Sequence, residues 1–279
     1  MIGERVETGS GSGGLERTVR WESSCPDVPE RRIRSYVRRR GRTTPAQRRS
    51  VEAHWPAFGL SLDGAHLLSE AFVRRRPIVV EIGFGSGENL LAAASEDRGR
   101  NFVGIEVYES GLGRVLGEAA RLGLSNLKVA AGDAVTLLER VPPGRLSEVW
   151  LFFPDPWPKK RQKKRRLVTP KFVRSVRETL RPGGRFLLST DCEDYAHRMT
   201  EVLEWDRGLR KIARAGEFAS RPAARRSSRY ERRARARGHV IHDLVYERRR
   251  SLPADAPSSA LPDRGSDRES GRVSPADVP

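Results

Sequence analysis

A short apolar run that ends in a glycine-rich turn constrains the fold of this chain more than any other feature. Residues 78–82 read Ile-Val-Val-Glu-Ile, and glycines follow at positions 83, 85 and 87. An apolar run of this length is typical of a strand that is buried on both faces of a parallel sheet. Glycines placed directly after such a strand let the backbone turn sharply and approach a ligand closely. The run therefore predicts the first strand of an α/β domain, with a ligand site at the turn.

The same alternation of strand and helix continues along the chain. Further strands are predicted at 102–106, 127–130, 148–153 and 185–189, and helices at 88–95, 110–122, 170–180 and 193–205. Two later apolar stretches, near 209–213 and 240–246, are expected to close the sheet as an antiparallel pair. Repeated βα units predict an open, mostly parallel sheet with an antiparallel edge strand and helices on both faces. Ligands of such sheets bind at the carboxyl ends of the strands.

Both ends of the chain differ in composition from this central region. Residues 1–30 and 251–279 are rich in Gly, Ser, Pro and charged residues and show no apolar periodicity. Such segments cannot bury enough apolar surface to fold, so we expect two disordered tails. A single domain over residues 31–250, with a basic N-terminal segment, is therefore predicted within the chain of 279 residues.

The charge balance indicates a polyanionic partner. Lysine and arginine number 53 against 36 acids, a formal net charge of +17, and an excess of this size is typical of proteins that bind nucleic acid. The two cysteines, Cys25 and Cys192, form neither a disulfide framework nor a CxxC metal site, which favours the cytoplasm and predicts no metal. No secretory signal and no apolar run of about 20 residues is present, so no membrane partner is expected.

Acidic residues stand at the ends of three successive predicted strands. Glu81 lies just before the glycines, Glu106 ends the second strand and Asp133 follows the third. A carboxylate beside a pyrophosphate is unfavourable, whereas one beside an ammonium or a sulfonium is favourable. Glu106 is placed to accept from a ribose diol, and Asp133 from an adenine amino group. Together with Gly83 and Gly85, this set resembles the S-adenosylmethionine pocket of class I methyltransferases, which have a Rossmann-like fold.

The fourth predicted strand runs into Pro154, Asp155, Pro156 and Trp157. Each proline fixes its own φ and restricts the residue before it, so Asp155 is expected to be held rigidly at a strand end beside the cofactor. Trp157 is expected to offer a face on which a base can stack. We interpret this turn as the reaction site.

A basic run follows the turn immediately. It comprises Lys159, Lys160, Arg161, Gln162, Lys163, Lys164, Arg165 and Arg166 and contains no acid. Two more arginine-rich blocks cover residues 31–49 and 221–237, with Tyr36 and Tyr230 among their arginines. Because these blocks are next to the expected site, we interpret them as phosphate contacts.

From about residue 33 to residue 248 the chain resembles the tRNA (guanine-N7)-methyltransferases. The most distinctive shared segment is residues 153–166, and residues 81–85, 104–106, 189–191 and 228–233 also match. Where the family usually has Thr-Lys-Phe-Glu, this chain has Ser-Arg-Tyr-Glu at 228–231. The resemblance implies methylation of guanine 46 in the variable loop of tRNA, with S-adenosylmethionine as cofactor.

The resemblance also implies a role for each matching residue. Glu81, Glu106, Asp133 and Asp155 would line the cofactor pocket, with Asp155 as the catalytic acid. The substrate guanosine would be held by Lys159, Asp191, Ser228, Arg229, Tyr230 and Glu231. RNA would be contacted by Arg161, Gln162, Lys163, Lys164, Arg165 and Arg166.

Three other interpretations of the sequence stay open. One is a class I methyltransferase that acts on another RNA or on DNA, although the turn lacks the second proline of the Asp-Pro-Pro-aromatic pattern of amino-methylating enzymes. The others are an NAD-dependent oxidoreductase, which Glu81 disfavours, and an RNA-binding protein without catalysis, which the set of acids disfavours.

Guanine N7 carries a lone pair and no proton, so Asp155 is expected to orient and stabilise rather than to act as a base. The chain is expected to be a monomer or a homodimer.

Overall fold

The computed structural model describes residues 35–36, 43–61, 68, 70–214 and 216–251. The predicted tails therefore lie outside the described residues, apart from Ser251. Much of the basic segment at 31–49 lies outside them as well.

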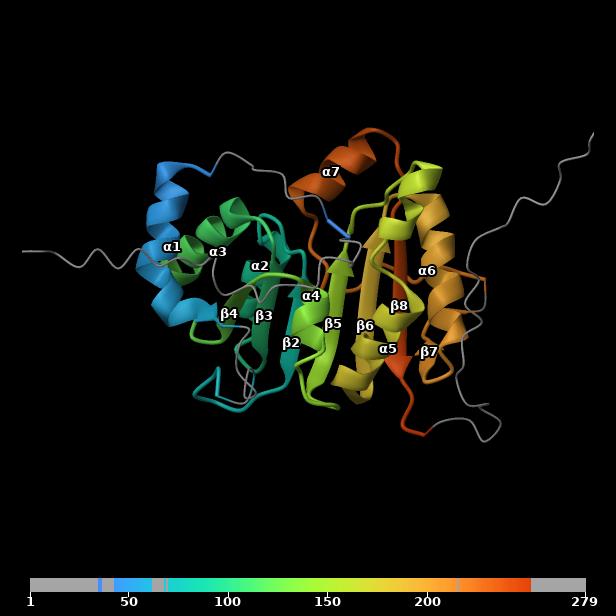
Figure 1. Ribbon diagram of the computed structural model, residues 1–279, viewed down its shortest axis with the longest axis horizontal. Coiled ribbons are helices and arrows are strands. Elements are labelled where there is room, and N and C mark those ends of the chain that lie inside the picture. The colour runs from blue at the N-terminus through green and yellow to red at the C-terminus, as the bar shows by residue number, and fades with distance from the viewer. Residues whose placement is uncertain (1–34, 37–42, 62–67, 69, 215, 252–279) are drawn as a thin grey trace, which may run out of the picture.

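A single sheet of eight strands forms the centre of the described part of the protein (Figure 1). Its strand order is β1-β4-β3-β2-β5-β6-β8-β7. The strands are β1 (Gly59–Leu60), β2 (Ile78–Ile82), β3 (Asn101–Glu106), β4 (Leu127–Ala131), β5 (Leu146–Phe152), β6 (Leu180–Thr190), β7 (Leu209–Lys211) and β8 (His242–Arg248). Strands β1 to β6 pair in parallel, and β8 pairs antiparallel with both β6 and β7. The predicted open, mostly parallel α/β sheet with antiparallel pairing at one edge is confirmed.

Helices cover both faces of this sheet. They are α1 (Pro45–Phe58), α2 (Glu88–Glu96), α3 (Glu109–Arg121), α4 (Ala134–Leu138), α5 (Pro170–Thr179), α6 (Glu193–Trp205) and α7 (Arg229–Ala236), and a 3-10 helix, η2, spans Lys160–Arg165. One buried cluster joins the sheet to α1, α2 and α3, and a second joins it to α4, α5 and α6. In Figure 1, α7 stands above the carboxyl ends of the parallel strands.

The alternation of side chains along β2 shows why the strand is buried throughout. Ile78, Val80 and Ile82 pack into the cluster with α4, α5 and α6, whereas Val79 packs into the cluster with α1, α2 and α3. Every residue of β2 is buried. Since side chains alternate between faces, Glu81 lies on the same face as Val79, beside α2.

The helices α1, α4 and α7 were not predicted from the sequence. Helix α1 contains Pro56 and buries only Val51, so it lacks a continuous apolar stripe. Helix α4 has only five residues, and α7 is dominated by arginine. The five central strands and the helices α2, α3, α5 and α6 lie where the sequence predicts them, within a few residues except at the start of β6. Helix α5 begins as predicted, with the Thr169 hydroxyl accepting a hydrogen bond from the Phe172 N–H.

Candidate active site at the carboxyl ends of the strands

The glycine turn after β2 forms one wall of a cavity of about 410 Å³. Gly83 and Gly85 have φ values of +69° and +55°, and a Cβ added to either would meet nothing within 4 Å. The backbone at these two positions is therefore open to a ligand. The remaining lining comes from the ends of β2, β3, β4 and β5 and from residues 35–36, 167 and 230. The volume suits a single small molecule.

Glu81 is a buried carboxylate next to this turn. The side chain is 3% exposed, and its Oε2 atom has no hydrogen-bond partner among the described residues. Burial, and next the charge of Glu106, raise the pKa of Glu81 to about 8, against a lowering by a hydrogen bond from Asn89. A buried carboxylate oxygen without a partner is costly, and a cationic group of a ligand is the natural partner for it.

Glu106, at the end of β3, organises the glycine turn. Its Oε2 accepts from the Gly85 N–H at 2.7 Å, and its Oε1 accepts from the N–H groups of Val107 at 2.7 Å and Tyr108 at 3.1 Å. Burial raises the pKa of Glu106, and these backbone donors oppose the rise. A carboxylate has about four lone-pair sites, so Glu106 retains the capacity for about one further donor, such as a ribose hydroxyl.

Asp133 follows β4 and serves as the N-cap of α4. Its Oδ1 accepts from the Val135 N–H at 2.9 Å, which fixes the carboxylate at the wall of the cavity. The structure thus brings Glu106, Asp133, Gly83 and Gly85 to one cavity, with Glu81 buried beneath the turn. An open glycine backbone, an orphaned acid and two anchored carboxylates suit the adenosine and amino acid ends of S-adenosylmethionine.

The turn after β5 places Asp155 at the same cavity. The residues on either side of the Pro154–Pro156 segment, Phe153 and Trp157, have positive φ values of 54° and 45°. Such a conformation costs on the order of 1–3 kcal/mol for a residue other than glycine. The Phe153 N–H donates to Ser189 O at 2.8 Å, which ties the turn to β6. The backbone on both sides of Asp155 thus has an unusual conformation, and the rigidity expected from the prolines stays a prediction.

The expected role of Trp157 as an exposed stacking face is wrong. Its side chain is 9% exposed, and its indole Nε1 donates to Ser35 O at 2.9 Å. The guanidinium of Arg165 lies 4.2 Å from the ring centroid and donates to Tyr36 O at 3.1 Å. Trp157 and Arg165 therefore join the reaction turn to residues 35–36 rather than to a base.

Tyr230, on α7, lies over the mouth of the cavity and joins two other elements. Its ring centroid is 5.1 Å from that of Phe153, and its hydroxyl donates to the Asp191 carboxylate at 3.2 and 3.3 Å. Burial, and next the charge of Asp191, raise the pKa of Tyr230 to about 12, so the hydroxyl remains a donor. His239 Nδ1 is 3.0 Å from Asp191 Oδ2. The structure thus brings together Tyr230 and Asp191, and it adds His239, which the sequence did not single out.

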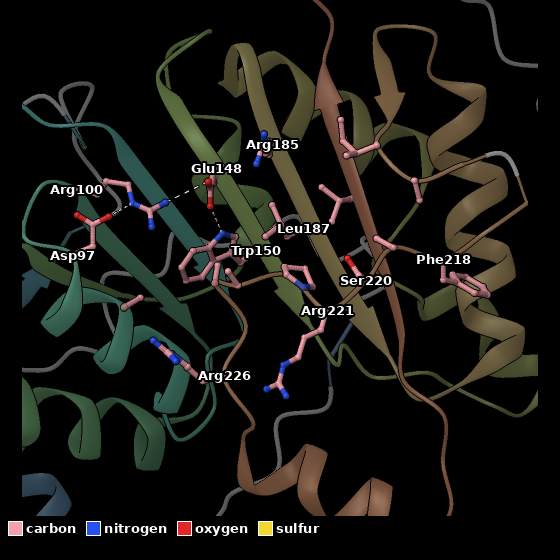
Figure 2. Close-up of a pocket in the computed structure, with 18 of the residues that line it drawn as sticks. Asp97, Arg100, Glu148, Trp150, Arg185, Leu187, Phe218, Ser220, Arg221 and Arg226 are labelled. Carbon is pink, nitrogen blue, oxygen red and sulfur yellow. Dashed lines mark hydrogen bonds and ion pairs between the residues drawn. The ribbon is translucent and has the colours of Figure 1, made fainter.

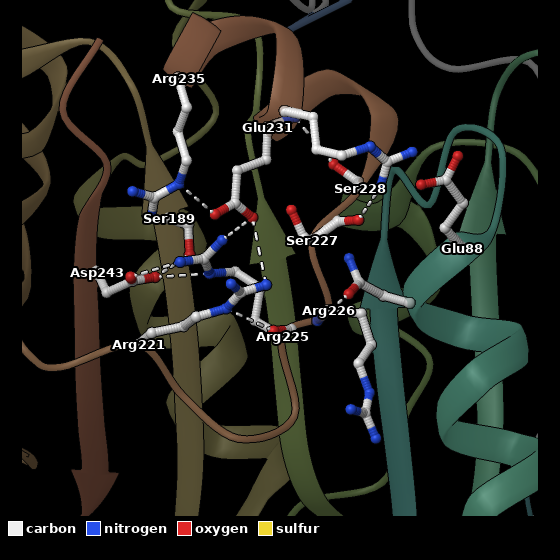
Figure 3. Close-up of polar contacts among 12 residues, drawn as sticks. Glu88, Ser189, Arg221, Arg225, Arg226, Ser227, Ser228, Glu231, Arg235 and Asp243 are labelled. Atoms are coloured by element: carbon white, nitrogen blue, oxygen red, sulfur yellow. Dashed lines mark hydrogen bonds and ion pairs between the residues drawn. The ribbon is translucent and has the colours of Figure 1, made fainter. Parts of the chain in front are cut away.

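A buried charge network anchors α7 to the sheet, with Arg225 between two carboxylates (Figure 3). The Arg225 side chain is fully buried and bonds Asp243 of β8 through Nε at 2.9 Å and through Nη2 at 2.7 Å. Its Nη1 bonds Glu231, which is also fully buried, and Ser189 of β6 donates to Asp243. This network fixes the helix that carries Tyr230.

Two members of the segment 228–231, Ser228 and Glu231, are engaged within the fold. Ser228 is the N-cap of α7 and accepts from the Glu231 N–H at 3.2 Å. The Glu231 carboxylate forms ion pairs with Arg225 and Arg235, so it does not face a substrate. The Arg229 N–H donates to Glu88 of α2 at 2.7 Å. Within this segment, Tyr230 is the side chain that lines the cavity.

The basic run forms η2 and is not uniformly exposed. Lys159, Arg161, Lys163 and Lys164 are exposed, and Gln162 and Arg165 are half-buried. Lys163 pairs with Asp194 at 2.9 Å. Arg166 is 6% exposed, donates to Pro156 O at 2.8 Å, pairs with Asp194 and lies over the Tyr195 ring. The expectation that Arg166 touches RNA therefore conflicts with its burial, because its guanidinium supports the reaction turn instead.

A larger cavity of about 820 Å³ lies on the α2 side of the sheet, over Trp150, Leu187 and Val245 (Figure 2). Arg100 pairs there with Asp97 at 2.7 Å and with Glu148 at 3.3 Å. None of the predicted site residues lines it, so the smaller cavity is the candidate site.

Within the described residues, no group of three or more His, Cys, Asp or Glu side chains is arranged to hold a metal ion. None of the described helices is long and apolar enough to span a membrane.

Known proteins resemble this chain over most of its length. A family model described as "Putative methyltransferase" matches residues 75–244. A tRNA (guanine-N(7)-)-methyltransferase of Methylococcus capsulatus is 47% identical over 221 residues, 79% of this chain and 96% of the relative. Enzymes of the same name from Hydrogenovibrio crunogenus and Chromohalobacter salexigens are 41% and 44% identical, over 84% and 80% of this chain and 99% and 92% of theirs. The chain therefore belongs to the tRNA (guanine-N7)-methyltransferase family.

Proposed function

We propose that this protein transfers the methyl group of S-adenosylmethionine to N7 of guanine in tRNA, at position 46 of the variable loop. The observation that carries the proposal is the shared cavity of the glycine turn and Asp155, with Tyr230 across its mouth. The names of the relatives support the substrate and the modified atom, and position 46 is what the family resemblance implies.

The proposed cofactor site is built from residues at the carboxyl ends of three strands, β2, β3 and β4. Glu81 would face the cofactor ammonium, Gly83 and Gly85 would let its amino acid end approach the backbone, and Glu106 and Asp133 would accept from ribose and adenine. Bound S-adenosylmethionine supplies an electrophilic methyl group on a sulfonium. The remaining tasks fall to the protein, which must hold guanine in line with that methyl group and exclude water.

Asp155 has a positional and electrostatic task in this proposal. Guanine N7 has a lone pair and no proton, so no general base is required. Methylation leaves the base positively charged, and a fixed carboxylate stabilises that charge as it develops. Two prolines and the unusual backbone at Phe153 and Trp157 support a fixed Asp155, which would need little reorganisation during the reaction.

Guanine itself would be held between α7 and the reaction turn. Phe153 and Tyr230 offer aromatic faces at the mouth of the cavity, and bases stack on such faces. Asp191, oriented by Tyr230 and His239, can accept from the N1 and N2 donors of guanine. Adenine has no donor at N1, so Asp191 would favour guanine.

Exposed cations within residues 159–164 and in α7 would contact tRNA phosphates around this site. They are Lys159, Lys160, Arg161, Lys163, Lys164, Arg229, Arg232 and Arg233. Such contacts position RNA without reading its sequence. The proposed substrate implies a cytoplasmic site of action, and the expectation of a monomer or homodimer stays a prediction.

The test is methyl transfer from radiolabelled S-adenosylmethionine to unmodified bulk tRNA, followed by digestion to nucleosides. Label in N7-methylguanosine supports the proposal. Label in another nucleoside, or transfer to ribosomal RNA or DNA but not to tRNA, would favour a different class I methyltransferase activity. An absence of transfer with intact cofactor binding would contradict the tRNA substrate.

A further inference from the structure

His239, in the connection between α7 and β8, contacts the carboxylate that is proposed to recognise guanine. Its Nδ1 atom is 3.0 Å from the Oδ2 atom of Asp191. An ionised carboxylate only accepts hydrogen bonds, so Nδ1 is the donor in this contact. The Asp191 side chain is 12% exposed and the His239 side chain 46%. The acid is therefore largely covered, while part of the imidazole ring faces solvent.

The pairing of β6 with β8 explains why these two residues meet, although they are 48 positions apart in the chain. Strand β6 ends at Thr190 and β8 begins at His242, and these two residues are partners in the antiparallel register. Asp191 therefore leaves the sheet beside the segment that enters β8. Backbone pairing thus brings the acid and the segment that carries the histidine to the same edge of the sheet.

The C-terminus of α7 fixes the backbone of His239. Gly238 has a φ of +79°, the left-handed conformation that is common directly after a helix C-cap. Its N–H donates to Arg235 O at 2.9 Å, and the His239 N–H donates to Ala234 O at 3.1 Å. These two hydrogen bonds make up a Schellman motif. His239 is therefore attached to the same helix that carries Tyr230.

Helix α7 thus contacts Asp191 from both of its ends. Tyr230 lies in the first turn, and its hydroxyl is shared between Oδ1 at 3.2 Å and Oδ2 at 3.3 Å. His239 follows the last turn and contacts Oδ2. A carboxylate has about four lone-pair sites, so these two donors leave room for about two more. Guanine presents two adjacent donors, at N1 and N2.

We propose that His239 is a positioning residue for guanine recognition, because its hydrogen bond to Oδ2 fixes the rotation of the Asp191 carboxylate so that both oxygens face the N1 and N2 donors. The rotation of an Asp carboxylate about its last bond is broad, and one hydroxyl shared between both oxygens defines it poorly. A second donor that contacts Oδ2 distinguishes the two oxygens and limits the rotation. The inference rests on the proposed function, because Asp191 must accept from the substrate guanine.

Inosine separates this role from a general effect on the fold. It keeps the N7 lone pair and the N1 donor of guanosine and lacks the N2 amino group, so it offers Asp191 one donor instead of two. A variant that only folds less well loses activity toward both bases equally, and the ratio of the two activities is unchanged. The ratio therefore reports how the carboxylate is placed.

His239→Ala and His239→Asn form a matched pair of variants. The asparagine amide can place a donor close to the position of Nδ1, whereas the alanine side chain has no donor. His197→Ala serves as a control, since it removes an exposed histidine of α6 that pairs with Glu193 at 3.8 Å.

The experiment measures kcat/KM for two transcripts of one tRNA, with guanosine or inosine at position 46. The wild-type protein should prefer guanosine by about 10-fold to 100-fold, the effect of one hydrogen bond to a charged group. His239→Ala should lower this ratio by about fivefold, since one hydrogen bond that holds the carboxylate is lost. His239→Asn and His197→Ala should keep the wild-type ratio.

Three results would overturn the inference: a wild-type ratio of one, a wild-type ratio retained in His239→Ala, and an equal fall in His239→Ala and His239→Asn. If His239→Ala does not fold, His239→Leu tests the inference through the same ratio, because leucine also lacks a donor and keeps more of the ring volume. Failure of the wild-type protein to methylate the guanosine transcript would instead contradict the proposed function.

Discussion

The hydroxyl of Tyr230 donates to the carboxylate of Asp191 at 3.2 Å, which links α7 to the loop that follows β6. The two residues are 39 positions apart in the chain. Tyr230 lines the cavity that Asp155 also borders, so this contact fixes the ring on which, in the proposed function, a base stacks.

Tyr230 should act mainly through its ring. Tyr230→Ala should lower kcat/KM for tRNA by about 5-fold to 150-fold, since stacking of a base on an aromatic ring contributes about 1–3 kcal/mol. Tyr230→Phe keeps the ring and loses the hydrogen bond to Asp191, so its effect should be smaller. Steady-state kinetics of both variants test the idea, and equal losses would argue against stacking.

Asp155→Asn should slow the chemical step. Removal of a fixed group that stabilises developing charge lowers rates by about 10²–10³-fold. Single-turnover methylation should therefore slow to that extent, while the Kd of S-adenosylhomocysteine changes by only a few fold. An unchanged single-turnover rate would remove Asp155 from the mechanism.

Arg225 and Arg226 are neighbours with different structural roles. Substitution of each by methionine should therefore lower the stability of the protein by different amounts. Arg225→Met leaves Glu231 and Asp243 buried without their shared cation, which should cost about 3–5 kcal/mol. Arg226→Met removes a pair with Glu96 whose side chains are half exposed, which should cost at most about 1 kcal/mol. Thermal denaturation should show a much lower Tm for Arg225→Met, and equal shifts would contradict the assigned roles.

Glu81 should destabilise the free protein as the pH rises. Its pKa of about 8 lies above its ordinary value of 4.5, so the folded state binds the proton more tightly than the unfolded state does. Stability is therefore lost between about pH 4.5 and pH 8. Glu81→Gln removes this loss, so its Tm relative to wild type should rise from pH 5 to pH 8, while cofactor binding is weakened. A pH-independent difference in Tm would contradict the raised pKa of this buried carboxyl group.

Substitutions of exposed and of buried residues in the basic run should have different effects. Only the exposed residues should change the salt dependence of tRNA binding. Arg161→Ala should reduce the slope of log K for tRNA against log salt by about 0.7–0.9, the loss of one phosphate contact. Arg166→Met should lower Tm instead, because Arg166 bonds Pro156 and Asp194 within the fold. An unchanged slope for Arg161→Ala would remove that residue from the RNA interface.

The sequence predicted the parts of the site that local rules govern. Apolar runs mark buried strands, and acids at strand ends meet at one edge of a parallel sheet, so the positions of Glu106 and Asp133 could be predicted from the sequence alone. The burial of Arg166 could not be predicted, because it depends on Asp194, which lies 28 positions away. Glu231 likewise resembles a surface acid in an arginine-rich stretch until Arg225 and Asp243 are seen around it. The contact of Asn89 with Arg226 joins residues 137 positions apart, and no pattern in the chain indicates it.

Transcripts of one tRNA made with either guanosine or 7-deazaguanosine test the central proposal most directly. In 7-deazaguanosine a C–H group replaces N7, so the lone pair is absent while the Watson–Crick edge is kept. With labelled S-adenosylmethionine, the guanosine transcript should be methylated and the 7-deazaguanosine transcript should not be, although both compete for binding. Equal labelling of the two transcripts would show that the methyl group goes to another atom and would contradict the proposal.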